Sequence, residues 1–415
     1  MPLFTQLFLI FLTLGTLLQF WLLVRHLGHV AKNRGEVPLE FSGKVDLSDH
    51  QKAADYTQAK GKIATIEIFL GVALLLFWTL GGGLDLLDRY WRGYDWGEVI
   101  IGMAFIFSFF FISSLLDLPF SLYRTFRMEA AFGFNRITPI QYLKDHLLGI
   151  LLALLLGGPL LWAILQLMES AGSYWWLAAW AVWMGFSLIL SWAYPRFVAP
   201  LFNTFTPLDE GEMRDRIQGL LQRCGFTSDG IFVMDGSKRS SHGNAYFTGF
   251  GKSKRIVFFD TLLEALNIDE MEAVLAHELG HFHHKHIIKQ MVLMGFLSLV
   301  GMALLGWLSQ QPWFYSGLGI THPSNSAALL LFMLTIPVFT TFFTPLGSYL
   351  SRRYEFQADD YAINQTNGEF LVQALVKLYQ DNASTLTPDP LYSLFHDSHP
   401  PAPVRIAHIS QRNSG

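Results

Sequence analysis

The sequence predicts an all-α membrane protein of seven transmembrane helices with an inserted α+β domain. Hydrophobic residues make up 51% of the 415 positions and charged residues only 15%, whereas soluble proteins carry about 25% charged residues. Seven apolar stretches are long enough to cross a bilayer, and between the fifth and the sixth lies a polar segment with mixed helix and strand patterns.

The composition also excludes several classes of protein. Disordered chains are poor in apolar residues, so disorder is excluded. The 29 Lys and Arg residues do not outnumber the 33 Asp and Glu residues, so nucleic-acid binding has no electrostatic support and none is expected. A single cysteine, Cys224, permits no internal disulfide.

The seven spans are read from apolar runs, since a helix needs about 20 apolar residues to cross the hydrocarbon core. The first run is too long for a cleavable signal peptide and lacks a basic start, so we expect it to remain as an anchor. The lipid bilayer is therefore a partner of the whole chain. The expected spans are 3–24, 63–84, 98–119, 147–168, 174–195, 287–308 and 326–349.

Loop charge predicts the orientation of these spans. Basic residues gather in the first and third loops, while the fourth and sixth loops contain no Lys or Arg. Because basic loops face the cytoplasm, the N-terminus is expected on the opposite side. The polar segment and the C-terminal tail then lie on the cytoplasmic side. The basic residues are Arg25, Lys32, Arg34, Lys44, Lys52, Lys60 and Lys62 in the first loop, and Arg124, Arg127, Arg136 and Lys144 in the third.

The chain divides into four parts on this basis. Residues 1–195 hold five spans, 196–286 a cytoplasmic domain, 287–349 the last two spans, and 350–415 the rest of that domain. Within 196–286 we expect a helix at 209–224, strands at 231–235, 244–250 and 255–259, and a helix from 268. Asn267 with Glu270 three residues later is typical of a capping box at the start of that helix.

The helix from 268 contains His277-Glu278-Leu279-Gly280-His281. Residues four apart share one helix face, so the two histidines can hold one Zn²⁺. Glu278 can then act as the general base that takes a proton from the attacking water and passes it to the leaving amine. This pattern predicts a zinc-dependent peptide hydrolase.

A catalytic zinc needs a third protein ligand. In one extended pattern a Gly and a His follow the motif at fixed spacing, but His284 and Ile287 occupy those positions here. Glu355 and Asp359, again four residues apart, offer a ligand and a carboxylate that orients a ligand histidine. On spacing alone, ordinary surface carboxylates remain the better interpretation, and Asp360 and Glu369 compete for the role.

Two further features stay open on residues alone. His283, His284 and His286 crowd the end of the same helix, where a second metal site is conceivable but residues at the membrane edge are the favoured interpretation. The segment Asn244-Ala245-Tyr246-Phe247 is either a core strand or an exposed edge that could hold a peptide substrate by strand addition.

Further motifs accompany the zinc motif, the Asn244 strand and Glu355 with Asp359: they are Gly133-Phe134-Asn135-Arg136, Ala199-Pro200-Leu201-Phe202, and His399-Pro400-Pro401 with Arg405. Together these motifs resemble one family, the type I CAAX prenyl proteases, which are integral-membrane zinc metalloproteases of the gluzincin type. The resemblance implies that the seven transmembrane helices surround a large intramembrane chamber. The resemblance implies that Glu355 is the third ligand of one Zn²⁺ per chain, that His399 stabilises the oxyanion, and that Asn244 and Arg405 contact the substrate. It also implies removal of the last three residues from a farnesylated C-terminal tetrapeptide, so that the partners are lipid-modified or membrane-associated peptides.

Two other functions remain open. A membrane quality-control protease would use the same chemistry without dependence on the prenyl group. A transporter or zinc-handling channel would need paired ionisable residues at mid-membrane, and the spans show none. Residues 411–415 contain no dilysine retrieval signal, which favours a bacterial member in the inner membrane. A eukaryotic member would lie in the endoplasmic reticulum.

Overall fold

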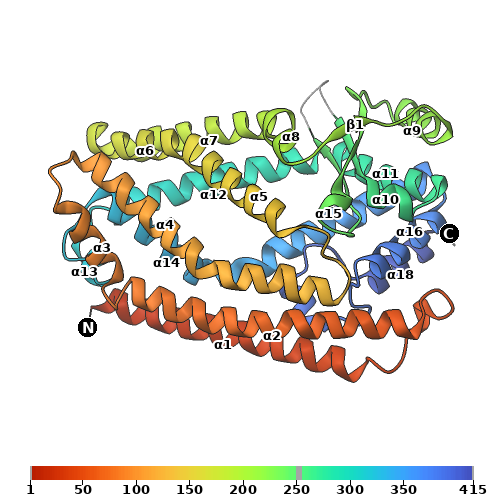
Figure 1. The fold of residues 1–415 in the computed structure, drawn as a ribbon, viewed down its shortest axis with the longest axis horizontal. Coiled ribbons are helices and arrows are strands. Elements are labelled where there is room, and N and C mark those ends of the chain that lie inside the picture. Colours follow the sequence, from red (N-terminus) through yellow and green to blue (C-terminus); the bar gives the residue numbers. More distant parts are fainter. Residues whose placement is uncertain (1, 249–254, 414–415) are drawn as a thin grey trace.

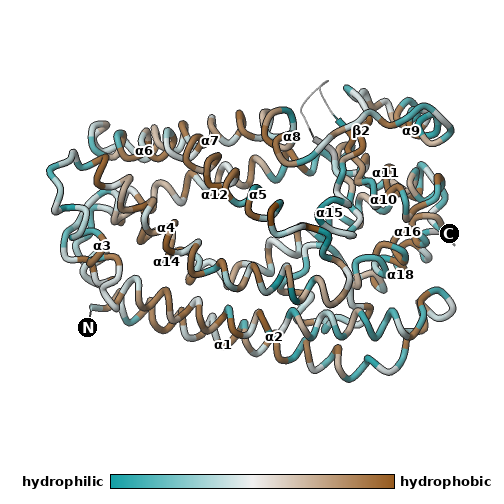
Figure 2. The backbone as a smooth tube through the Cα atoms, viewed as in Figure 1, coloured by the Kyte–Doolittle hydropathy of each residue, from teal (hydrophilic) through white to brown (hydrophobic). Residues whose placement is uncertain are grey.

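The computed structural model describes residues 2–248 and 255–413. Long helices run along the longest axis of the molecule, and the strands gather with shorter helices at one end (Figure 1). The N-terminus lies at the opposite end from the C-terminus. Hydrophobic residues predominate on the long helices, whereas hydrophilic residues are concentrated around the end that carries the strands (Figure 2). The chain thus separates an apolar helical part from a polar mixed part.

Seven helical segments in the described chain are long and apolar enough to span a membrane, as the sequence predicts. Several are longer than expected, and α2 starts at Leu47 rather than at 63. Lys52, Lys60 and Lys62, which were expected in the first loop, therefore lie on α2. The helices of the seven segments are α1 Leu3–Lys32, α2 Leu47–Trp78, α4 Glu98–Tyr123, α5 Pro139–Leu152 with α6 Gly158–Ser170, α7 Trp175–Ala193 with α8 Ala199–Phe202, α12 His286–Leu308, and α14 Asn325–Thr340 with α15 Thr344–Gln365.

The polar end contains a four-stranded sheet in the order β1-β2-β4-β3. Its strands are β1 Phe205–Pro207, β2 Ile231–Met234, β3 Ala245–Thr248 and β4 Arg255–Phe259. β2 and β4 are parallel, and the two outer pairs are antiparallel. The three predicted strands are confirmed, although positions 249–250 of the second lie outside the described residues. The sequence missed β1, which is only three residues long and ends in a proline.

Helices from two distant parts of the chain complete the polar end. α11 begins with the predicted capping box: the backbone N–H of Glu270 donates to Oδ1 of Asn267 at 2.9 Å, and the N–H of Asn267 donates to a Glu270 carboxylate oxygen at 2.9 Å. The helices are α9 Glu212–Arg223, α10 Asp260–Ala265, α11 Ile268–His283, α16 Gly368–Asp381, α17 Pro390–His396 and α18 Ala402–Asn413. The short helices α3 Gly83–Arg92 and α13 Pro312–Ser316 lie at the other end of the molecule.

One apolar core joins these pieces. It contains Phe258 of β4, Leu275 of α11, Leu375 of α16 and Ile406 of α18, all buried. Residues after 350 therefore pack with residues of 196–286 in a single core, because each amphipathic element must bury its apolar face against another. This packing brings α15 against α11, and α18 against α15 and α16.

Candidate metal centre

The site forms where α11 and α15 pack closely. A Cβ atom added to Gly280 would lie 2.8 Å from the Cα of Ala358 and 3.1 Å from its carbonyl oxygen. Both atoms belong to backbone that cannot rotate away. The glycine within the motif of α11 therefore permits an approach that no other residue would allow, and this approach sets the distance between the two helices.

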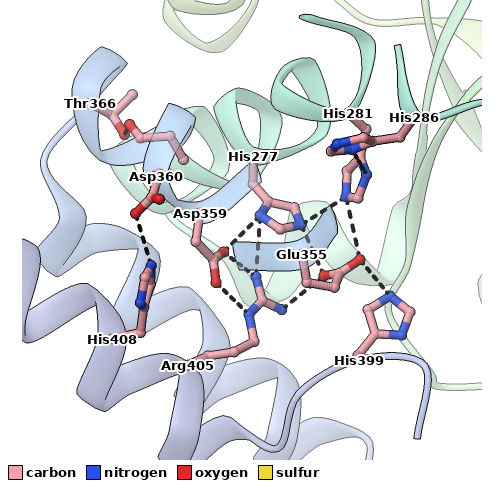
Figure 3. Close-up of polar contacts among 11 residues, drawn as sticks. His277, His281, His286, Glu355, Asp359, Asp360, Thr366, His399, Arg405 and His408 are labelled. Atoms are coloured by element: carbon pink, nitrogen blue, oxygen red, sulfur yellow. Dashed lines mark hydrogen bonds and ion pairs between the residues drawn. The ribbon is translucent and has the colours of Figure 1, made fainter. Parts of the chain in front are cut away.

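The approach brings Glu355 of α15 to His277 and His281 of α11 (Figure 3). The Nε2 atoms of the two histidines are 3.4 Å apart. Each also lies 3.4 Å from an oxygen of Glu355, His277 from Oε2 and His281 from Oε1. Nitrogen and oxygen ligands held about 2.0–2.1 Å from a tetrahedral zinc ion are separated by about 3.3–3.4 Å, so the three side chains fit such an ion.

Glu355 itself has the features of a metal ligand. Its side chain is 5% exposed, and Oε2 accepts no hydrogen bond from the part of the chain that the structure describes. A buried carboxylate oxygen without a donor is costly unless a cation completes its surroundings. These three residues form the one cluster of potential ligands found among the described residues.

Asp359 and Arg405 contact His277 and Glu355 and hold these side chains in position. Asp359 Oδ1 accepts a hydrogen bond from Nδ1 of His277 at 2.8 Å, and the Arg405 side chain donates to both oxygens of Asp359. Arg405 is 7% exposed, and its Nη1 lies 3.7 Å from Oε2 of Glu355. The ion pair therefore connects α18 to ligand candidates on α11 and α15, which favours a positioning role for Arg405 over direct contact with a substrate.

Opposing effects act on the imidazole of His277. Burial and the nearby Arg405 cation lower its pKa, whereas the hydrogen bond to Asp359 and the adjacent Glu355 carboxylate raise it, and the net result is a pKa of about 9. The environment of this ring is thus dominated by carboxylates and favours a positive charge. A divalent cation can supply that charge in place of a proton.

His286 is a supporting residue that the sequence did not reveal. Its Nδ1 lies 3.1 Å from Nδ1 of His281, and its Nε2 lies 2.8 Å from Oε1 of Gln357. His286 is the first residue of the sixth membrane segment, which agrees with the interpretation as a membrane-edge residue, but its side chain is only 1% exposed, whereas His283 is exposed. A positive φ of 57° at Lys285 separates α11 from α12 and turns His286 back toward the site.

Glu278, His399 and Asn244 complete the set of predicted residues. Glu278 is half-buried and has no polar partner among the described side chains. His399 is 66% exposed, and its Nε2 lies 3.3 Å from Oε1 of Glu355. Asn244 is exposed and immediately precedes β3, an edge strand of the sheet. The edge position agrees with the second of the two interpretations that the sequence left open for this segment.

Comparisons with known proteins match both halves of the chain. Residues 26–204 match the family model described as CAAX prenyl protease N-terminal, five membrane helices. Residues 207–413 match the model for peptidase family M48. The division between the two falls beside β1, where the helical part gives way to the sheet.

Curated relatives and a solved structure agree with these matches. A CAAX prenyl protease 1 homologue of Oryza sativa subsp. japonica is 38% identical over 76% of this chain and 75% of its own length. CAAX prenyl protease 1 of Saccharomyces cerevisiae is 32% identical over 89% and 88%, respectively. The crystal structure of S. mikatae Ste24p superposes with a TM-score of 0.90 at 30% identity and covers 99% of both chains. These relatives are eukaryotic, and the expectation of a bacterial source stays a prediction.

Proposed function

The chain belongs to peptidase family M48 and is a multi-pass membrane metalloprotease, and from this premise we propose that it removes the last three residues from prenylated CAAX-type peptides. The observation that carries the proposal is the cluster of His277, His281 and Glu355, with ligand atoms 3.4 Å apart and with His277 and Glu355 buried. The names of the similar proteins support the substrate class, since they are CAAX prenyl proteases.

We assign one Zn²⁺ per chain to the trio. The mixed nitrogen and oxygen donor set suits zinc, and three protein ligands leave a fourth position open for chemistry. When bound, the ion polarises the scissile carbonyl and lowers the pKa of a bound water. Asp359 holds the His277 ring through Nδ1 so that Nε2 faces Glu355, and His286 does the same for His281.

Glu278 moves the proton in this scheme. It follows His277 directly on α11, and its carboxylate is free to accept a proton from the attacking water because no described side chain engages it. It then donates that proton to the nitrogen of the leaving peptide. The two carboxylates therefore have different roles: Glu355 faces the histidines, and Glu278 remains available for proton transfer.

His399 and Asn244 are assigned to the substrate. His399 is exposed, and its Nε2 lies beside Glu355. From this position Nε2 can donate a hydrogen bond to the oxygen that becomes negative as the peptide bond is attacked. Asn244 begins an edge strand, and an extended peptide can pair with such an edge through main-chain hydrogen bonds. The substrate would then lie between β3 and the metal ligands.

The location of the site suits a membrane-bound substrate. Glu355 lies on α15, which continues the seventh membrane segment, and His286 opens the sixth. A lipid-modified peptide in the bilayer is therefore near the reacting groups, and the chamber implied by the family resemblance would receive it. The basic first and third loops favour a cytoplasmic active site, in the endoplasmic reticulum of a eukaryote or the inner membrane of a bacterium.

One comparison of substrates tests the proposal. Purified full-length protein with measured zinc content is given a farnesylated CAAX peptide, its unprenylated twin and an unfolded membrane protein. We expect cleavage after the modified cysteine and a clear preference for the farnesylated peptide. Equal cleavage of all three substrates would favour quality-control proteolysis. If a chelator abolishes cleavage and added zinc restores it, either activity depends on the metal.

A further inference from the structure

A cavity of about 530 Å³ adjoins the metal site on the side of His399. One wall consists of α1 and α2, and the other of the segment from Tyr379 to Pro401, which includes α17. His399 lines the cavity and also lies 3.3 Å from Glu355. The cavity therefore begins at the reacting groups and extends away from α11. Its volume lies in the range of ligand-binding cavities, about 300–1,000 Å³.

Lys60 of α2 contributes a cation to this cavity. Its side chain is exposed to the open space, and its Nζ lies 4.2 Å from the ring centroid of Tyr56. Within residues 2–248 and 255–413, no carboxylate oxygen lies within 4.0 Å of this ammonium. A lysine that faces an open cavity without an anionic partner is suited to bind an anion that enters from outside.

The neighbouring carboxylates are engaged elsewhere. Asp389 pairs with Arg25 at 2.9 Å and caps the start of α17 through the N–H groups of Leu391 and Tyr392. Glu129 accepts a hydrogen bond from the hydroxyl of Tyr56 at 2.6 Å. Asp397 is the carboxylate that lines the cavity itself, and burial raises its pKa above the usual range. The charge of Lys60 therefore remains unneutralised by a direct ion pair.

We infer that Lys60 binds the C-terminal carboxylate of the peptide substrate and that the cavity takes the three residues to be released. This inference rests on the proposed function, because only cleavage near a C-terminus places a carboxylate close to the metal. Three extended residues reach about 10 Å beyond the scissile bond, at about 3.3 Å per residue. Every such peptide ends in a free carboxylate, whatever its last side chain. One cation that binds this carboxylate therefore sets the distance between the end of the chain and the bond that is cleaved.

The test compares two peptides that differ only at the last group. Both are farnesylated CAAX peptides, one with a free carboxylate and the other with a carboxamide. We expect the wild-type protein to prefer the free acid by about tenfold or more in kcat/KM, since a charge-assisted contact is lost with the amide. In Lys60→Gln the ratio should fall to about one, mainly through a higher KM for the acid.

Lys52→Gln is the matched control. Lys52 lies two turns earlier on α2, makes a similar contact with the ring of Phe134 at 4.9 Å, and lines a different cavity. The Lys52→Gln variant should keep the preference for the free acid. A wild-type protein that cleaves both peptides equally, or a Lys60→Gln variant that keeps the preference, would overturn the inference and leave the proposed function intact.

Binding provides a second readout that does not depend on turnover. The same two peptides, carrying a fluorophore, are titrated into the Glu278→Gln protein, which should bind without cutting. The free acid should bind about tenfold more tightly than the amide, and the added Lys60→Gln change should remove the difference. Equal affinities for the two peptides would contradict the inference even if the proposed function failed as well.

Discussion

The guanidinium of Arg405 forms a two-point ion pair with the carboxylate of Asp359, with Nε 2.9 Å from Oδ2 and Nη2 2.5 Å from Oδ1. The same carboxylate holds Nδ1 of His277 at 2.8 Å. A helix near the C-terminus thereby fixes the orientation of a ligand candidate on α11. Both partners are buried, so each depends on the other for compensation of its charge.

Asp359→Asn should weaken zinc binding about 10–100-fold, because loss of a carboxylate that orients a ligand histidine typically costs that much. Competition with a chelator of known affinity measures the effect. Asp360→Asn is the control, since Asp360 pairs with His408 on another face of α15. A zinc affinity in Asp359→Asn equal to that of the control would exclude the orienting role.

Glu278→Gln should retain zinc and lose cleavage by about 10²–10⁴-fold or more, because the amide keeps the shape of the side chain but cannot accept the proton. Metal analysis and peptide turnover on the same preparation measure both. Glu369→Gln, which changes an exposed carboxylate on α16, should affect neither. Wild-type turnover in the Glu278 variant would show the mechanism to be wrong.

His399→Ala should lower kcat about 10²–10³-fold, the usual loss when one donor to a developing oxyanion is removed. Zinc content should not change, because His399 is not one of the three residues assigned to the metal. The measurement is steady-state kinetics with metal analysis. A variant that loses its zinc instead would make His399 part of the metal site.

His286→Ala should weaken zinc binding, since the ring of His281 would lose the neighbour that lies 3.1 Å from its Nδ1. We expect a loss of about tenfold, at the lower end for supporting residues. His283→Ala removes an exposed histidine from the same turn of chain and serves as the control. Equal zinc affinities in the two variants would show that His286 does not support His281.

Gly280→Ala should separate α11 from α15, because the new methyl group would meet the backbone of Ala358. We expect a stability loss of about 1–3 kcal/mol, together with weaker zinc binding. Gly219→Ala on α9 is the control, where the nearest atom to a new methyl group is 3.7 Å away. Thermal unfolding with and without zinc measures both effects, and a Gly280 variant as stable as the control would contradict the packing argument.

Local patterns allowed much of this protein to be predicted. The membrane spans follow from apolar runs, because the bilayer imposes a minimum length that a single segment satisfies by itself. The capping box at Asn267 and Glu270 and the helical spacing of His277 and His281 are likewise local, since their partners lie within four residues. These features were confirmed wherever the structure describes them.

The site beyond His277 and His281 depended on contacts between distant segments. Spacing alone favoured Glu355 and Asp359 as surface carboxylates; only the family resemblance gave Glu355 its expected role, and the structure places Glu355 3.4 Å from both histidines. His286 and the approach at Gly280 were not recognised, because periodicity identifies the buried face of a helix but not the partner that covers it. Sequence therefore determined which helices form and which chemistry they carry, whereas the packing of α11, α15 and α18 decided which side chains meet around the metal.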